Sequence, residues 1–494
     1  MIKVSALSLL AYKVGPNLFD LSSQMYHVSM RDQMHRAVAL AEALVAGDQF
    51  KVCNQVLSVG AGVAGVSAGI VLARHGVDVQ IIDTSDKAPF ALQRGVFNRY
   101  VGPYMYEWPL DVYGSQKMPQ PRFSALAAWD NGRTPPLPFG FADPAEPPDL
   151  VVGWDNALRG NLKNPSAHLR LQIGVKRDPT NGAIKAWLVE QRRAFEARKE
   201  YESVDVDITG GAPWQNSQPL HQPLRPRFVI LAGGLGTENT QIKGARTGYV
   251  IQGLPFWASD RVLEHQCGFT FKPRIVVLGG GDGALQDTLR ALTRHIHPVD
   301  TWHQLLSRDV HGTLADGLPR IISLEAQHAQ MSIWAHNDAL RASAQETLDQ
   351  AYAVVAQELS QDSALAFAAM DMLRDDVESV RLCIKESYFS KSYSLNRFMV
   401  HYFEQCIKRH GGSGVAGRFE ISRNCELMDI PKLGPPTTLR FSAGNDRVVD
   451  LVVVRFGVDT SQLPGQTLGL SKQDTQNRQE LAAVPLPLYF PPSK

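Results

Sequence analysis

The sequence lacks the features that mark several common classes of protein. Its 494 residues carry 50 basic and 49 acidic side chains, so the formal net charge is only +1. This balance gives no reason to expect a nucleic-acid or acidic-membrane partner. No run of about 18 or more apolar residues is present, so we expect no membrane span. The 44% apolar content suits a protein with a large core. We expect the substrate to be a small molecule.

Cysteine motifs and metal-ligand patterns are also missing. None of the five cysteines forms a C-x-x-C pair, so neither a local redox dithiol nor a zinc ribbon is visible. Scattered cysteines suit a reducing compartment, and the N-terminus lacks a clear signal-peptide cleavage site, so we expect a cytoplasmic location. His295 and His297 form an isolated i,i+2 pair, and we expect no metal site. No G-x-S-x-G nucleophile motif occurs, and the sequence identifies no catalytic acid or base.

Glycine, by contrast, is abundant in two informative places. Residues 56–83 read "VLSVGAGVAGVSAGIVLARHGVDVQIID", a short apolar strand followed by a G-x-G-x-x-G turn and a helix. Gly60 permits the tight turn, Gly62 lets a pyrophosphate approach the backbone, and Gly65 lets the helix pack close to the strand. The pattern therefore predicts a dinucleotide-binding unit, and the alternative is a glycine-rich turn without a ligand.

Two further residues belong to this predicted site. Asp83 ends the following strand, near the spacing expected for a carboxylate that holds ribose hydroxyls. Ala64 lies in the first turn of the helix, whose N-terminus offers unpaired N–H groups and a positive dipole end to phosphates.

A related pattern returns at residues 275–292, "IVVLGGGDGALQDTLRAL". An apolar run leads into Gly279 and Gly281, and the motif continues through Asp282 to Ala284, which still allows close packing at the third position. A second nucleotide-binding unit is predicted. The alternative is a structural strand–helix turn that binds nothing.

Two apolar segments end in glycine or acidic residues. "PRFVILAGGLGTE" at residues 226–238 runs into Gly233, and "VVDLVVVRFGVDT" at residues 448–460 contains Asp459. Either segment alone is also typical of a core strand followed by a turn.

Together, these four segments resemble the flavoprotein superfamily with two dinucleotide-binding domains, of the glutathione-reductase and thioredoxin-reductase type. The resemblance implies that the first motif and its acidic partner bind FAD and that the second motif binds NADPH or NADH. It implies that "VILAGG" with Gly233 closes onto the FAD domain. It also implies that "DLVVVRFGVD" is the strand where the chain returns to FAD, with Asp459 near the ribityl chain.

The sequence departs from this family in several places. Without a C-x-x-C motif, the dithiol chemistry of the disulfide reductases does not carry over. In the second motif, "GGGDGALQDTL", Gly283 replaces the serine of thioredoxin reductases, and Gln286 and Asp287 replace two glutamates. Arg308, in "LLSRD", is the candidate for binding the 2′-phosphate at a strand end, which favours NADPH.

The stretch after Asp83 is rich in aromatic and arginine residues. The resemblance implies that it wraps the FAD pyrophosphate, which makes four residues candidate cofactor or substrate contacts: Arg94, Arg99, Tyr100 and Trp108. The alternative is an ordinary aromatic loop packed on the core.

The predicted fold class is α/β, with two Rossmann-like dinucleotide-binding domains, an inserted loop-rich or β segment and an inserted helical segment. A helix over residues 30–48 is expected to serve in packing or as an oligomer contact, so a homo-oligomer is a candidate assembly. The expected segments are an N-terminal helical extension (1–50), an FAD-binding segment (51–114), an insertion and candidate substrate region (115–225), a return to the FAD domain (226–270), an NAD(P)-binding-like segment (271–337), a helical segment (338–415) and a C-terminal return to the FAD domain (416–494).

These observations favour an FAD-dependent oxidoreductase that takes electrons from NAD(P)H and passes them to an organic substrate or to oxygen. Two alternatives remain open. One is an FAD-dependent amine or amino-acid oxidase that uses no NAD(P)H. The other is a non-catalytic flavin-binding sensor or assembly subunit.

Overall fold

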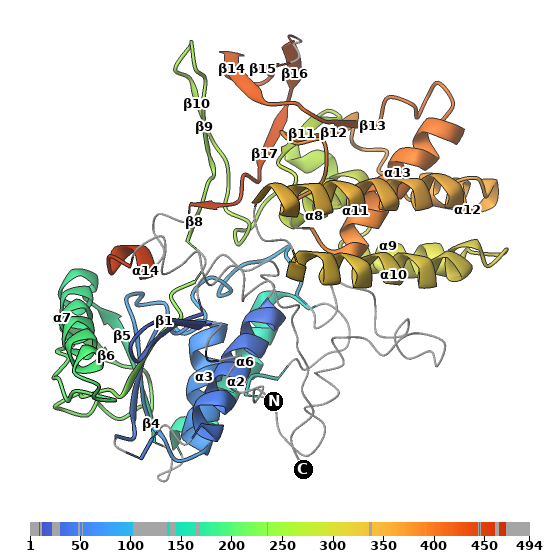
Figure 1. Cartoon of the computed structure of the whole chain (residues 1–494). Coiled ribbons are helices and arrows are strands. Elements are labelled where there is room, and N and C mark those ends of the chain that lie inside the picture. The colour runs from blue at the N-terminus through green and yellow to red at the C-terminus, as the bar shows by residue number, and fades with distance from the viewer. Residues whose placement is uncertain are drawn as a thin grey trace.

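The structure is a computed structural model, and it contains two α/β units (Figure 1). It describes residues 9, 12–21, 30–47, 50–51, 53–101, 136–138, 145–163, 168–234, 236–334, 338–390, 392–442, 444, 446–459 and 464–470. Among these residues, no helix has both the length and the apolar character needed to cross a membrane.

The first unit is built on a seven-stranded sheet in the order β1-β2-β7-β3-β4-β5-β6. The five central strands are parallel, and the two edge strands run antiparallel to their neighbours. The strands are β1 (Lys13–Gly15), β2 (Leu18–Asp20), β3 (Gln55–Val59), β4 (Asp78–Asp83), β5 (Leu169–Val175), β6 (Gly210–Pro213) and β7 (Phe228–Leu231).

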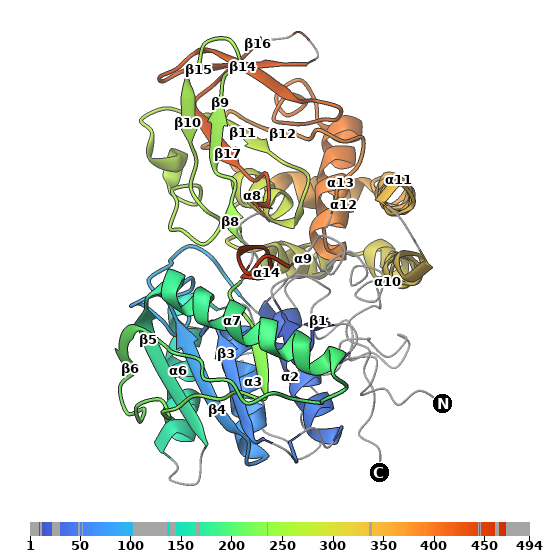
Figure 2. The same cartoon turned by 60° about the vertical axis from the view of Figure 1, so that its left-hand side comes forward.

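Helices cover both faces of this sheet, because alternate residues of each buried strand point to opposite sides. Phe228 and Ile230 of β7 join the apolar core that contains α2 (Met30–Ala46), α3 (Val63–Arg74) and α6 (Pro147–Lys163). Val229 and Leu231 join the opposite core, with α7 (Arg177–Glu196). In Figure 2, α7 crosses the sheet on the side facing the viewer.

The N-terminal extension is an integral part of this unit. Strand β2 pairs in parallel with β7, and α2 buries Met34, Leu40 and Leu44 completely in the shared core. The helix predicted at residues 30–48 is therefore present and packs within the unit. The predicted insertion at 115–225 requires correction, because α6, β5, α7 and β6 complete the first sheet and its helical layers.

The second unit has a four-stranded, fully parallel sheet in the order β13-β12-β11-β17. Its strands are β11 (Arg274–Leu278), β12 (Ser379–Cys383), β13 (Phe419–Ser422) and β17 (Leu451–Val454). On one face lie α8 (Asp282–Leu292) and α13 (Ser394–His410). On the other lies an antiparallel sheet of β14 (Leu427–Lys432), β15 (Thr437–Phe441) and β16 (Asp446–Val449).

Four helices stand between α8 and the next strand of this sheet. They are α9 (Pro298–Ser307), α10 (Thr313–Trp334), α11 (Asp338–Leu359) and α12 (Ser363–Asp371). The predicted boundary at residue 337 is thus wrong, since the helical segment interrupts the second unit. The segment "HPVDTWHQLLSRD", whose last residues "LLSRD" we placed at a strand end, forms α9 because Pro298 starts the helix and His297 caps it.

The C-terminal strand also requires correction. We predicted that residues 416–494 return to the FAD domain through the strand in residues 448–460, but β17 pairs with β11 in the second sheet, with Ile275 opposite Leu451. The chain reaches the first unit only afterwards, at α14 (Pro464–Thr467), where Leu468 and Leu470 enter the core beside α7. Shorter elements complete the fold: β8 (Thr237–Glu238), β9 (Gln241–Lys243), β10 (Val250–Gln252), η1 (His265–Gly268) and β18 (Val458–Asp459).

Candidate dinucleotide-binding sites

The first glycine turn joins β3 to α3, and two of its glycines are required by the fold. Gly60 has φ +116, and a Cβ there would overlap the carbonyl oxygen of Ala232. A Cβ at Gly65 would overlap the carbonyl oxygen of Gly60. Gly62 differs, because its φ is −78 and no atom lies within 4 Å of the position of a Cβ. The fold therefore does not need glycine at 62, whereas a ligand approaching the N-terminus of α3 does.

Asp83 lies beside this turn. Its Oδ2 accepts a hydrogen bond from the Ala61 amide at 2.6 Å, and its Oδ1 accepts one from the Ser85 amide at 2.8 Å. The structure thus brings together the turn and the carboxylate that the sequence selected. An ionised carboxylate has room for further donors, so ribose hydroxyls could still bind. Ala64 is buried in the first turn of α3, and the exposed Gly233 follows Ala232 directly.

The candidate residues after Asp83 differ in their surroundings. The Arg94 guanidinium donates to Asp155 of α6 at 2.6 Å and to the Pro89 carbonyl at 2.7 Å, so it braces the loop against α6. Tyr100 is half-buried, and burial followed by the nearby Glu146 raises the pKa of its phenol. Trp108 lies outside the described residues.

The second glycine turn, between β11 and α8, has the same construction as the first. Gly279 has φ +133, and a Cβ there would overlap the carbonyl oxygen of Arg455, the residue after β17. Ala284 is completely buried at the third position of the motif. Strands β11, β12 and β17 thus repeat the arrangement of β3, β4 and β7 around the first turn.

This repeat identifies the residue that corresponds to Asp83. Gly60 donates its N–H to the Ile82 carbonyl at 2.7 Å, and Gly279 donates its N–H to the Cys383 carbonyl at 3.0 Å. The next residue is Asp83 in the first unit and the fully buried Ile384 in the second. The position equivalent to Asp83 therefore has no carboxylate in the second unit, and the exposed Lys385 follows directly.

Part of the chain lies against the second turn. We call Tyr388, Ser390, Tyr393 and Asn396 the covering segment. The Ser390 amide donates to the Gly280 carbonyl at 2.9 Å, and the Ser390 carbonyl oxygen lies 3.7 Å from the Cβ position of Gly281. Asp282 Oδ1 accepts from the Tyr393 amide at 3.1 Å and from Asn396 Nδ2 at 3.0 Å. The Cβ position of Gly281 therefore has a neighbour in the covering segment, whereas the Cβ position of Gly62 has none within 4 Å among the described residues.

Two predicted site residues lie elsewhere. Arg308 caps the C-terminus of α9 and pairs with Asp371 of α12 at 2.8 Å, on the surface, so we withdraw it as the residue at the strand end of the second unit. Asp459 ends β18, which pairs with β8 rather than with any strand of the first sheet. The place of Asp459 near the ribityl chain of FAD stays a prediction.

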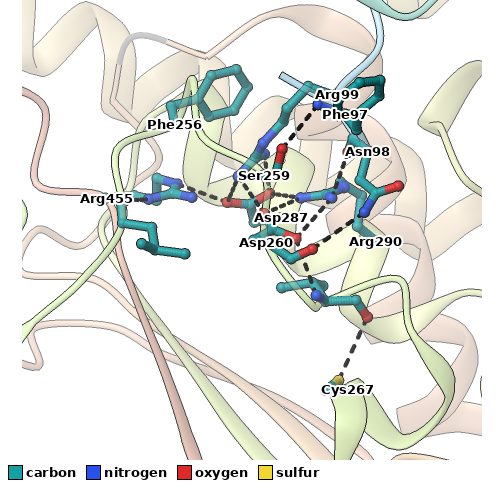
Figure 3. A network of polar contacts seen from close by, with 12 residues as sticks. Phe97, Asn98, Arg99, Phe256, Ser259, Asp260, Cys267, Asp287, Arg290 and Arg455 are labelled. Atoms are coloured by element: carbon teal, nitrogen blue, oxygen red, sulfur yellow. Dashed lines mark hydrogen bonds and ion pairs between the residues drawn. The ribbon is translucent and has the colours of Figure 1, made fainter. Parts of the chain in front are cut away.

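Sequence reasoning missed a buried charge cluster between the two units (Figure 3). Arg99 follows the first glycine unit, and its guanidinium contacts Asp287 of α8 at 2.5 Å and Asp260 at 2.7 Å. Arg290 contacts the same two carboxylates, at 2.6 and 3.0 Å, and Arg455 contacts Asp287 at 2.7 Å. Burial alone would raise the pKa of Asp287, but the three guanidiniums outweigh it and lower the pKa.

This cluster assigns a structural role to two residues that the sequence had singled out. Arg99 was a candidate cofactor contact, and Asp287 was a departure from the thioredoxin-reductase pattern. Both are buried where they join the loop after the first glycine unit to the helix after the second. Their separation along the chain left no local signal of this contact.

No protein-family model matches the chain, and no curated protein sequence matches it. Among solved structures, bacillithiol disulfide reductase from Staphylococcus aureus is 11% identical, with a TM-score of 0.33 over 82% of this chain and 76% of that one. Thioredoxin reductase from T. acidophilum is 13% identical, with a TM-score of 0.30 over 83% of this chain and 80% of that one.

A third similar structure is the Cu(II) complex of a HOCl-induced flavoprotein disulfide reductase from Escherichia coli. It is 12% identical, with a TM-score of 0.31 over 85% of this chain and 60% of that one. TM-scores this low carry no argument about the activity of this chain. The geometry itself establishes an α/β fold with one mainly parallel and one fully parallel sheet, each of which has a glycine turn between a central strand and the following helix.

Proposed function

We propose that this protein is an FAD-dependent oxidoreductase that holds FAD at the first glycine turn. The observation that carries the proposal is the open position of Gly62 beside the carboxylate of Asp83. Gly62 stands at the N-terminus of a helix, where the fold itself does not need glycine. Asp83, a residue of the type that binds ribose hydroxyls, lies beside the same turn.

The residues of the first turn have defined roles in this proposal. The amides at the start of α3 and the dipole of that helix would hold the pyrophosphate. Asp83 would accept hydrogen bonds from ribose hydroxyls while keeping the turn closed through Ala61. When bound, the flavin supplies the hydride and electron chemistry, and the protein supplies position and electrostatics.

The proposed electron donor is NADPH, bound at the second glycine turn. The construction of this turn matches that of the first turn, because Gly279 donates its N–H to the Cys383 carbonyl and lies against the Arg455 carbonyl. At the strand end, Ile384 offers no acceptor for the ribose hydroxyls of NADH, whereas the adjacent Lys385 offers a cation for a 2′-phosphate. Lys385 replaces Arg308 as the specificity residue of the proposal.

A second candidate function is an oxidase reduced directly by its organic substrate. The observation that favours it is the covering segment, because the Ser390 carbonyl oxygen lies 3.7 Å from the Cβ position of Gly281, on the side from which a pyrophosphate would approach. In this case the second turn is structural. Reduction of the bound flavin by NADPH distinguishes the two candidates.

Substitution of Asp83 tests the FAD site. Asp83→Asn removes the charge that holds ribose hydroxyls, and a lost hydrogen bond to a charged group corresponds to about 1.5–3 kcal/mol, or roughly a tenfold to hundredfold weaker Kd. Asp78→Asn, at the other end of the same strand, is the matched control and should leave FAD affinity unchanged. Equal FAD affinity in all three proteins would overturn the ribose role of Asp83.

A further inference from the structure

Two cysteines far apart in the sequence lie together at one end of the second sheet. Cys383 is the last residue of β12, and Cys425 follows β13. The Cys425 amide donates to the carbonyl of Ile384, the residue next to Cys383, at 2.8 Å. Both side chains pack on the same apolar cluster beneath β14 and β15. Cys425 is also the neighbour with the largest effect on the pKa of the Cys383 thiol. The backbone and the side chains therefore place the two cysteines next to each other.

The two thiols have different environments. Cys383 is buried, whereas Cys425 is half-buried and reachable from solvent. The neighbouring Cys383 lowers the pKa of the Cys425 thiol, helped by Arg381 and Arg447. The neighbouring Cys425, together with burial, raises the pKa of the Cys383 thiol. This asymmetry separates an attacking sulfur from a resolving one.

We propose that Cys383 and Cys425 form a redox-active dithiol that converts to a disulfide by exchange with a low-molecular-weight disulfide. The pair does not depend on the flavin proposal, because it stands on contacts within the second unit alone. It also differs from a C-x-x-C motif, since the fold rather than the sequence makes the two residues neighbours.

The exchange balances in two steps. The Cys425 thiolate attacks one sulfur of the disulfide RSSR, which forms a mixed disulfide and releases RS⁻. The Cys383 thiol then loses its proton and attacks the Cys425 Sγ, which forms the Cys383–Cys425 bond and releases a second RS⁻. Overall, the protein dithiol loses two electrons and two protons, and RSSR becomes two RSH.

The position of the pair connects it to the second glycine turn. The carbonyl oxygen of Cys383 accepts the N–H of Gly279 at 3.0 Å, and Lys385 follows two residues later. A disulfide would tie the end of β12 to the segment between β13 and β14. We therefore expect the redox state of the pair to change the mobility of the turn-side end of β12.

Thiol trapping on the full-length protein tests the proposal. The protein is equilibrated with oxidised or reduced glutathione, alkylated in denaturant so that buried thiols react, digested with trypsin and analysed by mass spectrometry without reduction. The peptides 382–385 (LCIK) and 424–432 (NCELMDIPK) each contain one of the two cysteines. We expect them to be linked after treatment with oxidised glutathione and to be separate, each alkylated at its one cysteine, after treatment with reduced glutathione.

Variants identify the attacking sulfur. In Cys425→Ser, Cys383 should stay alkylatable after oxidised glutathione, whereas in Cys383→Ser, Cys425 should retain glutathione as a mixed disulfide. Cys53→Ser, in the first unit, should leave the linked peptide unchanged. If the two peptides of the unmodified protein remain unlinked at every glutathione ratio, the proposal is wrong, and that result requires no variant to fold.

Discussion

Arg99 and Asp287 form a buried ion pair between the two units, with Arg99 Nη1 and Asp287 Oδ1 at 2.5 Å. Arg99 follows the first glycine unit, and Asp287 lies on the helix after the second turn. Both side chains are buried almost completely. The pair, with Asp260, Arg290 and Arg455, therefore fixes the two candidate nucleotide sites relative to each other.

Loss of the central carboxylate should destabilise the protein strongly. Asp287→Asn leaves Arg99 and Arg290 with Asp260 as their remaining carboxylate and takes from Arg455 the carboxylate that it pairs with. Breaking a buried pair in this way costs about 3–5 kcal/mol of the free energy of unfolding. Urea unfolding and thermal melting measure the effect. Asp371→Asn, which breaks the exposed pair with Arg308, is the control and should change neither curve. Equal curves for the two variants would contradict this account of the cluster.

Gly62→Ala should separate binding from folding. No atom lies within 4 Å of the added Cβ, and φ is negative, so stability should change by no more than about 1 kcal/mol. The Cβ stands in the approach of the pyrophosphate to the backbone, so FAD content should fall sharply. Gly412→Ala, another open position, should keep its FAD. A yellow Gly62→Ala protein with normal FAD affinity would contradict the proposed site.

Gly281→Ala is the matching test of the second turn. The added Cβ would lie 3.7 Å from the Ser390 carbonyl oxygen, an ordinary contact, so the variant should fold and bind FAD. Reduction of its flavin by NADPH should be lost, because the side chain obstructs the pyrophosphate. Stopped-flow absorbance under anaerobic conditions measures this step. If the variant is reduced at the normal rate, no nucleotide binds at this turn.

Lys385 should decide between the two pyridine nucleotides. Lys385→Ala removes the cation at the strand end, and we expect Kd for NADPH to rise about tenfold, which corresponds to about 1.4 kcal/mol, while Kd for NADH stays constant. Glu426→Gln is the control, since it removes the 2.8 Å pair with Lys385 but keeps the cation. Equal effects of Lys385→Ala on both nucleotides would remove its proposed role.

Acid should destabilise the protein in part through His297. Burial lowers the pKa of this histidine from 6.5 to about 3, and its neutral Nδ1 accepts the Val299 amide at the N-terminus of α9. The unfolded chain therefore binds this proton more readily, so the contribution of His297 is present above pH 6.5 and is lost as the pH falls towards 3. His297→Asn keeps a capping acceptor without a titrating group. Its stability should fall less between pH 6.5 and 4, and an unchanged pH dependence would contradict this assignment.

The first glycine unit could be predicted because its information is local. Strand, turn, helix and acidic strand end are contiguous over residues 56–83, and each glycine has its own steric reason. The positions of Gly60, Gly65 and Asp83 follow from that spacing. The open space beside Gly62 could not be predicted in this way, because it depends on which distant parts of the chain pack near the turn.

The second unit could be predicted only at its turn. Helices α9 to α12 separate α8 from β12, so the strand that supplies Ile384 and Lys385 was not recognised, and Arg308 was chosen instead. The run "DLVVVRFGVD" is equally compatible with either sheet, and only its pairing with β11 shows that it belongs to the second. The charge cluster and the Cys383–Cys425 pair have no local signal, because their members meet only through the tertiary fold.

The measurement that tests the central claim most directly is the visible spectrum of the purified protein, followed by anaerobic titration with NADPH and NADH. The account predicts a yellow protein with a flavin absorption band that bleaches with NADPH at lower concentrations than with NADH. A yellow protein that neither nucleotide bleaches would contradict the proposed electron donor and favour the substrate-reduced oxidase. A colourless protein that takes up no added FAD would contradict the proposed function itself.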